Sequence, residues 1–256
     1  MTEILHEHFR LKETIVTISA REKEHMDAAR ASIAEQRCYL EEFIENDPFF
    51  RITLEPYDLQ ANDAPDIVKQ MIESSAIIGV GPMACVAGAI AGFAVQAMID
   101  DGATYAIVDN GGDVCILNDR PILVGIYAGS SSIRDLAFQI PARNKPFGIC
   151  TSSGTVGPSI SFGCADAATV IADNLALADA AATALGNSVQ STGSLKECFS
   201  AIERPGITGA LVIRGQEMAL WGELPPLLRA HVSEERITKG RVPFAVKKML
   251  FAIQCG

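Results

Sequence analysis

The chain has 256 residues, 48% hydrophobic and 20% charged, so it is long enough to bury a large core without disulfides or a structural metal. Lysine and arginine total 21 against 31 aspartate and glutamate residues, and the net charge of −10 excludes a general attraction to nucleic acids or anionic membranes. We therefore expect one domain over residues 1–256, built as a single core or as two closely packed halves.

The cysteines and the first residues bear on where the protein is found. Seven cysteines are scattered along the chain without a CxxC pair, which is typical of reduced, mostly buried thiols. Residues 1–10 are polar, with two histidines, and lack the basic start and apolar centre of a secretory signal. Both observations predict a cytoplasmic protein.

One uncharged stretch raises the question of a membrane span. Ser75 to Ile99 contains 25 residues without a charge, and Gly88 and Gly92 have the GxxxG spacing of packed membrane helices. However, Gly79 to Pro82 interrupts the stretch and leaves 17 residues from Met83 to Ile99. A buried core helix accounts for a segment of this length, so we expect no membrane span.

The first half of the chain predicts a strand followed by helices. Phe9 to Ser19 is rich in β-branched residues and is expected to be a strand, and Arg21 to Asn46 a long, solvated helix closed by Asp47-Pro48. A short amphipathic helix is expected over Pro65 to Glu73. After a turn at Gly79 to Pro82, Met83 to Ile99 forms a helix with many small residues.

The second half predicts mostly sheet. Four strands are expected, over Ala103–Val108, Val114–Leu117, Pro121–Tyr127 and Phe147–Cys150. The later elements are an alanine-rich helix over Asp173–Leu185 ended by Gly186-Asn187, a hairpin of Thr208–Arg214 with Glu217–Trp221, and a final helix over Val242–Ile253. Strands and helices do not alternate, so we predict an α+β fold with a mixed or antiparallel sheet and packed helices.

Asp109 to Asp113, with the sequence DNGGD, lies between two predicted strands. The glycines Gly111 and Gly112 permit a positive φ and a close approach to a ligand, and Asp113 could accept hydrogen bonds or help to hold a cation. The same residues are common in a tight hairpin without a ligand. Taken by itself, this segment favours the hairpin.

Thr151, Ser152, Ser153 and Gly154 follow the predicted strand that ends at Cys150. Hydroxyls and free amides at a strand end suit phosphate or ribose oxygens. The segment has no lysine and no GxSxG pattern, so it is neither a Walker loop nor a recognisable serine nucleophile. A polar loop without a ligand explains it equally well.

Asp179 and Thr183 are four residues apart and share one face of a predicted helix. A carboxylate and a hydroxyl suit Mg²⁺ when water and ligand phosphates complete its coordination shell. The alternative is a buried helix in which Asp179 binds a neighbouring backbone group. The histidines His6, His8, His25 and His231 have no paired metal spacing and are expected at the surface.

The three segments occur in the order and approximate spacing of the ApbE-like superfamily, the FAD:protein FMN transferases and their relatives. Asp109 to Asp113 resembles the family's NxGGD turn, Thr151 to Gly154 its TSG loop, and Ala178 to Leu185 its ADAxxTAL helix. Gly88 to Gln96 is similar to the family's GAIAKGYAVD stretch. It lacks the lysine between Ala91 and Gly92 and has glutamine in place of the aspartate.

The resemblance covers roughly Ser75 to Asn187 and is strongest with a smaller, uncharacterised branch of the superfamily. It implies that Asp179 and Thr183 bind Mg²⁺ and that Gly111 to Asp113 and Thr151 to Gly154 bind FAD or a related nucleotide in a cleft. It also implies FMN transfer or pyrophosphate cleavage assisted by the metal. Asp109 stands where the family has asparagine, and no residue is identified as catalytic.

Two hypotheses follow from these observations. The first is a protein that binds a flavin- or nucleotide-type ligand with Mg²⁺ and transfers part of it. The second is a ligand-binding or assembly protein that kept the fold and lost transferase activity, which the missing lysine and Gln96 favour. In both cases the expected partner is a small molecule, and homo-oligomerisation is left open.

Overall fold

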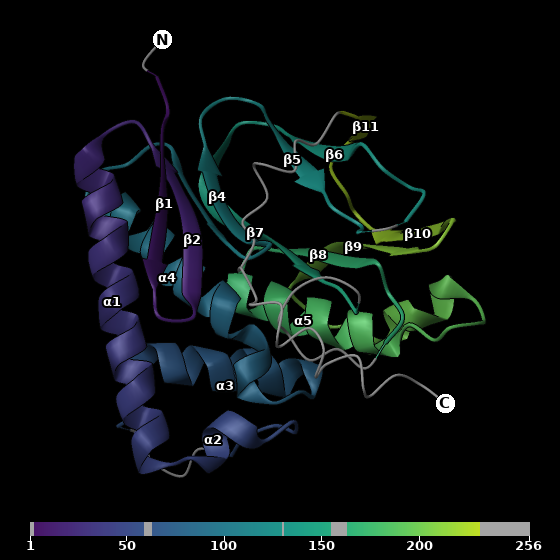
Figure 1. Cartoon of the computed structure of the whole chain (residues 1–256), viewed down its shortest axis with the longest axis horizontal. Helices are drawn as coiled ribbons and strands as arrows, with labels where there is room; N and C mark the ends of the chain where they lie inside the picture. The colour runs from purple at the N-terminus through teal and green to yellow at the C-terminus, as the bar shows by residue number, and fades with distance from the viewer. Residues whose placement is uncertain (1–2, 59–62, 130, 155–162, 231–256) are drawn as a thin grey trace.

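The computed structural model describes residues 3–58, 63–129, 131–154 and 163–230. Its centre is an antiparallel eight-stranded sheet with the order β1-β2-β3-β4-β7-β8-β9-β10, and a three-stranded sheet has the order β11-β6-β5. Helices cover one face of the large sheet and the small sheet covers part of the other (Figure 1). The α+β prediction is confirmed.

The strands of the large sheet are β1 (Leu5–Leu11), β2 (Thr14–Ala20), β3 (Ala106–Asn110), β4 (Asp113–Asn118), β7 (Arg143–Ser152), β8 (Ala167–Ala172), β9 (Ile207–Arg214) and β10 (Glu217–Gly222). The small sheet contains β5 (Ile122–Ile126), β6 (Leu136–Ile140) and β11 (Leu227–Arg229). The helices are α1 (Lys23–Asn46), α2 (Phe49–Ile52), α3 (Asp66–Ile78), α4 (Val86–Asp100) and α5 (Leu175–Ser188), with 3₁₀ helices η1 (Pro82–Cys85) and η2 (Leu195–Ala201).

The N-terminal segment differs from its prediction as a single strand. β1 and β2 form a hairpin in which Leu11 pairs with Thr14. Lys12 makes the turn with a φ of 53° and forms an ion pair with Glu41 of α1. No glycine or asparagine marks this turn, which is why the sequence pattern failed to indicate it.

Helix α4 is the uncharged segment whose membrane propensity was in question. By length and composition, Pro82–Asp100 is long and apolar enough to span a bilayer. Half of this apolar stretch is buried inside the protein. α4 packs between α1 and α5 and against β3 and β4. These contacts are those of a core helix, as predicted.

The helix predicted over Asp173 to Leu185 has different ends. α5 continues through Gly186 and Asn187 to Ser188, so the prediction that these two residues end the helix was wrong. A Cβ on Gly186 would lie 3.3 Å from the Ser152 hydroxyl oxygen. The glycine therefore allows the helix to approach β7 closely.

Two apolar clusters lie on opposite faces of the large sheet. Along β4, Cys115 and Leu117 join the cluster beneath the helices, whereas Ile116 joins the cluster beneath the small sheet. Since side chains alternate along a strand, Asp113 faces the helices together with Cys115. This alternation brings the DNGGD segment toward α4 and α5.

Several further features of the structure differ from the predictions. β6, β8 and β11 were not predicted, and the helix expected over Val242–Ile253 lies outside the described residues, as does His231. His25 was expected at the surface, but it is buried on α1 and hydrogen-bonded through Nδ1 to Asp101 at 2.8 Å. The six described cysteines are free thiols, and four of them are buried.

Candidate functional site

The DNGGD and TSSG segments lie side by side at one end of the large sheet. Gly111 and Gly112, with φ values of 72° and 109°, form the turn between β3 and β4. Asp113 pairs directly with Cys150 of β7, and the Thr151 amide donates to the Gly112 carbonyl at 3.2 Å. The turn is thus a hairpin, and it also adjoins the second predicted segment.

Asp179 lies on α5 and reaches the beginning of α4. The Gly88 amide donates to its Oδ2 at 2.8 Å, and the aspartate is only 8% exposed. Because the first amides of a helix have no partner within the helix, and because its N-terminal end carries partial positive charge, a carboxylate is stabilised here. Asp179 therefore caps α4, which is the structural alternative that the sequence left open.

Two more polar side chains bind the same stretch of backbone. Thr183 of α5 donates through its hydroxyl to the Ala84 carbonyl at 3.3 Å, and Asn110 donates through its amide to the Ala87 carbonyl at 3.0 Å. The DNGGD turn and the α5 helix are therefore both tied to residues 84–88. No local sequence pattern indicated this role of Asn110.

Gly88 is required for this arrangement. A Cβ at this position would lie 2.7 Å from the Asp179 Cβ and 2.7 Å from the Leu175 carbonyl oxygen. Contacts this short force the two helices apart. The glycine thus allows α4 and α5 to meet closely enough for Asp179 to reach the Gly88 amide.

Asp113 and Asp179 form an acidic pair between the sheet and the helices. Burial raises the pKa of Asp113 well above its usual range, and the neighbouring charge of Asp179 raises it further. A hydrogen bond from the Cys150 thiol opposes this rise, and the smaller effects of the Asp109 charge and the Thr151 amide act in opposite directions. Burial also raises the pKa of Asp179 to about 7, although the amides of Gly88 and Ala87 oppose this. Within the described chain, no ion pair to lysine or arginine neutralises either carboxylate.

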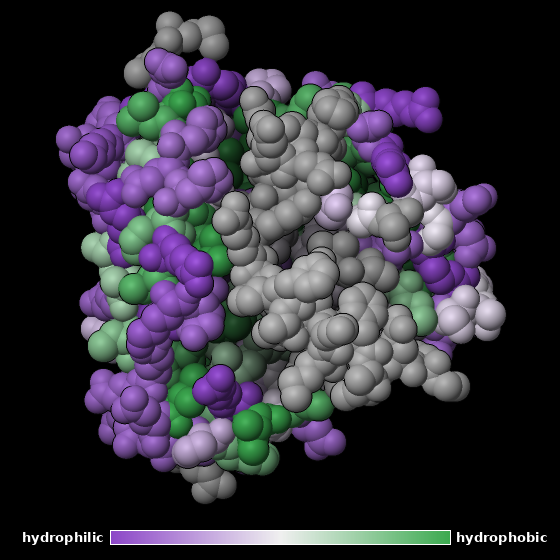
Figure 2. Space-filling model, in the orientation of Figure 1, coloured by the Kyte–Doolittle hydropathy of each residue, from purple (hydrophilic) through white to green (hydrophobic). Residues whose placement is uncertain are grey.

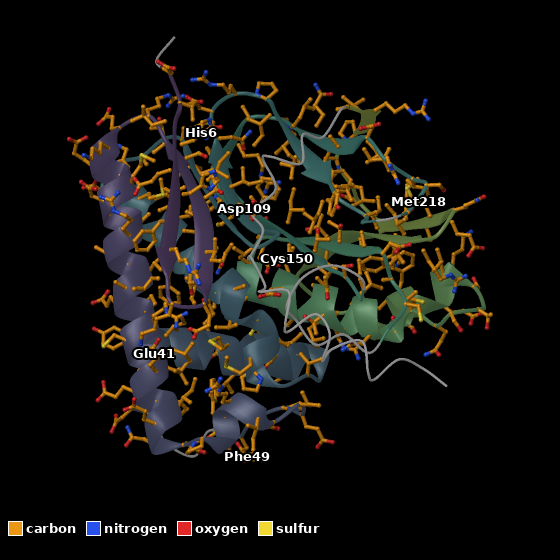
Figure 3. All side chains as sticks on the ribbon, viewed as in Figure 1. His6, Glu41, Phe49, Asp109, Cys150 and Met218 are labelled. Carbon is orange, nitrogen blue, oxygen red and sulfur yellow. The ribbon has the colours of Figure 1, made fainter. Side chains whose placement is uncertain are left out.

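Two buried thiols line the acidic pair. Burial and the charge of Asp179 raise the pKa of Cys85, and burial together with Asp113 raises the pKa of Cys150. Cys150 also donates to the Leu175 carbonyl at 3.6 Å. Both groups stay protonated near neutral pH, so neither is an activated nucleophile. Figure 3 labels Cys150 and Asp109 near this end of the sheet.

The hydroxyl-rich segment is partly engaged within the protein. The hydroxyls of Thr151 and Thr169 are hydrogen-bonded at 3.0 Å, and the Gly154 amide donates to the Ala165 carbonyl at 2.9 Å. Ser152 packs against Gly186 of α5. The side chains of Thr151 and Ser152 therefore help to fix the sheet end against the helix.

The side chains of this site supply some, but not all, of the ligands that a hard divalent cation needs. Two carboxylates held close together, with no ion pair to a described lysine or arginine, are the donors that Mg²⁺ prefers. Across the described ranges, however, no three side chains of His, Cys, Asp or Glu form a group that could hold a metal ion. A cation here would need oxygen ligands from Thr183, the backbone and a bound phosphate.

A separate hollow of about 680 Å³ lies away from these residues. Ile133, Arg134 and Arg229 are among the side chains that line it, and none of the site residues predicted from the sequence does. It therefore does not correspond to the ligand cleft expected beside Asp113 and Asp179. That cleft stays a prediction.

The fold, in which a large sheet lies between helices and a small sheet, is that of an ApbE-like protein. The placement of residues 88–96, 109–113, 151–154 and 178–185 agrees with this class. A protein-family model described as "AbpE bacteria" matches residues 3–203, and the chain belongs to this family. Within it, the chain is similar to proteins named UPF0280. It is 58% identical to one from Methanothrix thermoacetophila over 93% of this chain and 100% of that protein, and 52% identical to one from Methanococcoides burtonii over 91% and 99%.

Solved structures of flavin transferases share the fold. The apo flavinyl transferase ApbE of Pseudomonas stutzeri has a TM-score of 0.54 with 12% identity, covering 94% of this chain and 98% of that one. A mutant of the flavin transferase ApbE of Vibrio cholerae has a TM-score of 0.53 with 14% identity, covering 86% and 97%. Identities this low establish a common fold and leave the activity to be argued from the site.

Proposed function

We propose that this protein binds a flavin- or nucleotide-type ligand together with Mg²⁺ beside the acidic pair of Asp113 and Asp179. The observation that carries the proposal is that Asp179 is buried and Asp113 is partly buried beside it, and that neither carboxylate forms an ion pair with a lysine or arginine that the structure describes. Burying such a pair is costly, and a divalent cation offsets that cost. The protein is proposed to act in the cytoplasm as one domain.

The proposed ligand contacts come from α5, from the turn between β3 and β4, and from the end of β7 with the residues that follow it. The metal would lie near Asp179 and Thr183, where Asp179 Oδ2 is already oriented by the Gly88 amide. The flavin or nucleotide would contact Gly111, Gly112 and Asp113 on one side, and Thr151, Ser152, Ser153 and Gly154 on the other. When bound, Mg²⁺ would supply charge neutralisation for a pyrophosphate.

The test is a titration of purified protein with FAD in MgCl₂ or in EDTA, followed by flavin fluorescence. We expect quenching that depends on Mg²⁺, and we expect Asp113→Asn to abolish it. Asp173→Asn is the matched control, since Asp173 is an exposed acid just before α5. Absence of quenching in the wild type at high micromolar FAD contradicts the proposal.

A binding protein without transfer activity is the second candidate. The family's aspartate in the α4 segment is replaced by Gln96, which is exposed and bonded to Asp100 at 2.8 Å on the same helix. The segment also has no lysine between Ala91 and Gly92. These changes remove two charged groups that could assist a reaction and leave the DNGGD turn intact.

Mass spectrometry separates the two candidates once FAD binding is established. Incubation with FAD, Mg²⁺ and a threonine-containing acceptor protein yields a flavinylated acceptor and AMP if the protein is a transferase. AMP and free FMN without a modified acceptor indicate hydrolysis. Intact FAD that is bound and recovered unchanged identifies a binding protein.

A further inference from the structure

An unusual concentration of exposed apolar side chains surrounds helix α2. Phe49, Ile52 and Leu54 are 59%, 70% and 66% exposed, the highest values among the large hydrophobic residues of the described chain. Ile77 of α3 is 46% exposed. We call Phe49, Ile52, Leu54 and Ile77 the α2 patch. Figure 2 shows hydrophobic surface at this lower end of the molecule, where Figure 3 labels Phe49.

The α2 patch is built on closely packed backbone. α2 and α3 both contact η1. A Cβ on Gly81, just before η1, would lie 2.1 Å from the Thr53 carbonyl oxygen and 2.9 Å from the Leu54 Cα. This close approach ties the segment that carries Leu54 to the end of α3, where Ile77 lies.

An aromatic cluster holds the patch in place. Tyr57 packs edge-on against Phe50 at 5.2 Å and lies 6.4 Å from Phe49, and its hydroxyl donates to Asp47. The Phe49 amide donates to Asp47 Oδ1 at 3.0 Å. Apolar side chains presented on a fixed frame lose little conformational entropy when a partner covers them. Exposed apolar clusters of this kind are typical of protein interfaces.

Two charges flank the patch and point to the kind of partner. Arg51 and Glu55 are both exposed, lie on either side of Ile52 and Leu54, and form no ion pair with any residue that the structure describes. In a two-fold interface every contact occurs twice, so a surface must be complementary to itself. The segment from Arg51 to Glu55 meets this requirement. When it packs antiparallel to its own copy, each arginine faces the glutamate of the other copy.

We propose that the α2 patch is the interface through which two copies of this chain associate about a two-fold axis. The axis passes near Thr53, so that Arg51 of each copy faces the partner's Glu55 while Ile52 and Leu54 of both copies form the apolar centre. The proposal does not depend on the ligand site, which lies at the Asp113 end of the sheet.

Sedimentation velocity of the full chain over a concentration series tests the proposal. We expect a dimer for the wild type, and for Leu54→Asp a dissociation constant at least tenfold higher. Leu123→Asp, at a residue 56% exposed on β5, is the matched control and should leave the dimer unchanged. Thermal unfolding midpoints of both variants confirm that they fold.

Charge reversal tests the two-fold arrangement itself. Arg51→Glu and Glu55→Arg should each weaken the dimer several-fold, because each places two like-charged pairs across the axis. The double variant should recover the wild-type affinity. A monomeric wild type at high concentration overturns the proposal. A dimer that is unaffected by Leu54→Asp, or that the double charge reversal fails to restore, overturns it as well.

Discussion

Replacing Asp179 with asparagine isolates the cost of burying its charge. The side chain is 8% exposed and has a pKa of about 7, compared with an ordinary value of 3.8. As the pH rises from 3.8 toward 7, the unfolded chain releases this proton while the folded chain keeps it. The free energy of unfolding therefore falls by about 1.4 kcal/mol per pH unit over this range and is constant above it.

Asparagine cannot ionise, and its side-chain carbonyl can still accept from the Gly88 amide. The advantage of Asp179→Asn over the wild type in metal-free buffer should therefore grow by about 3 kcal/mol between pH 5 and pH 8. Excess Mg²⁺ at pH 8 should stabilise the wild type by mass action and leave the variant unchanged.

Urea unfolding followed by tryptophan fluorescence measures both effects. Trp221 is the single tryptophan, and it stacks on Phe199 at a ring distance of 6.3 Å, where it reports loss of packing. Asp173→Asn is the control and should differ from the wild type equally at both pH values. If the difference between Asp179→Asn and the wild type is the same at pH 5 and pH 8, the reasoning about the acidic pair is wrong.

Further substitutions test the packing around the site and in the aromatic cluster of α2. Gly88→Ala should lower the unfolding free energy by about 1–3 kcal/mol. Gly92→Ala is its control: a Cβ there meets its nearest neighbour at 3.7 Å, so the change should be neutral or slightly stabilising. Calorimetry compares the two variants. Asn110→Ala removes the bond to the Ala87 carbonyl and should cost about 1–2 kcal/mol in urea unfolding. Phe50→Ala, at a fully buried ring, should cost about 3–5 kcal/mol in the same assay.

The parts of the fold that were predictable carry strong local signals. α1 has a long polar helical pattern, and the β9–β10 hairpin turns at Gly215, which has a φ of 60°. β8 was missed because all six of its residues are buried. A strand buried on both faces has no alternating pattern, and Ala167–Ala172 is also close in composition to the alanine-rich helix that follows.

The site was predictable only as a set of segments. Their order predicted that DNGGD, TSSG and the α5 helix lie near one another, and the β4–β7 pairing places the first two side by side. What the sequence could not give is that Asp179, Thr183 and Asn110 all bind the backbone of residues 84–88. These bonds join residues between 23 and 99 positions apart, so no local pattern could indicate them.

This geometry changes how the sequence motif should be interpreted. Asp179 caps α4, and Thr183 binds the 3₁₀ helix η1 that precedes α4, so the fold needs both residues whether or not a ligand is bound. Retaining the ADAxxT pattern is therefore weak support for activity. A stability loss in Asp179→Ala also fails to separate a metal ligand from a helix cap.

Substituting Asp113 distinguishes a ligand-binding carboxylate from a structural one better than substituting Asp179. The raised pKa of Asp113 reflects burial and the charges of Asp179 and Asp109, and among the described residues the Cys150 thiol and the Thr151 amide oppose them. Asp113→Asn should therefore stabilise the metal-free protein at pH 8 while removing Mg²⁺ and flavin binding. A variant that unfolds less easily but binds Mg²⁺ and flavin less tightly shows that the Asp113 carboxylate serves ligand binding and not stability. Equal stability together with unchanged binding would assign Asp113 to the hairpin alone.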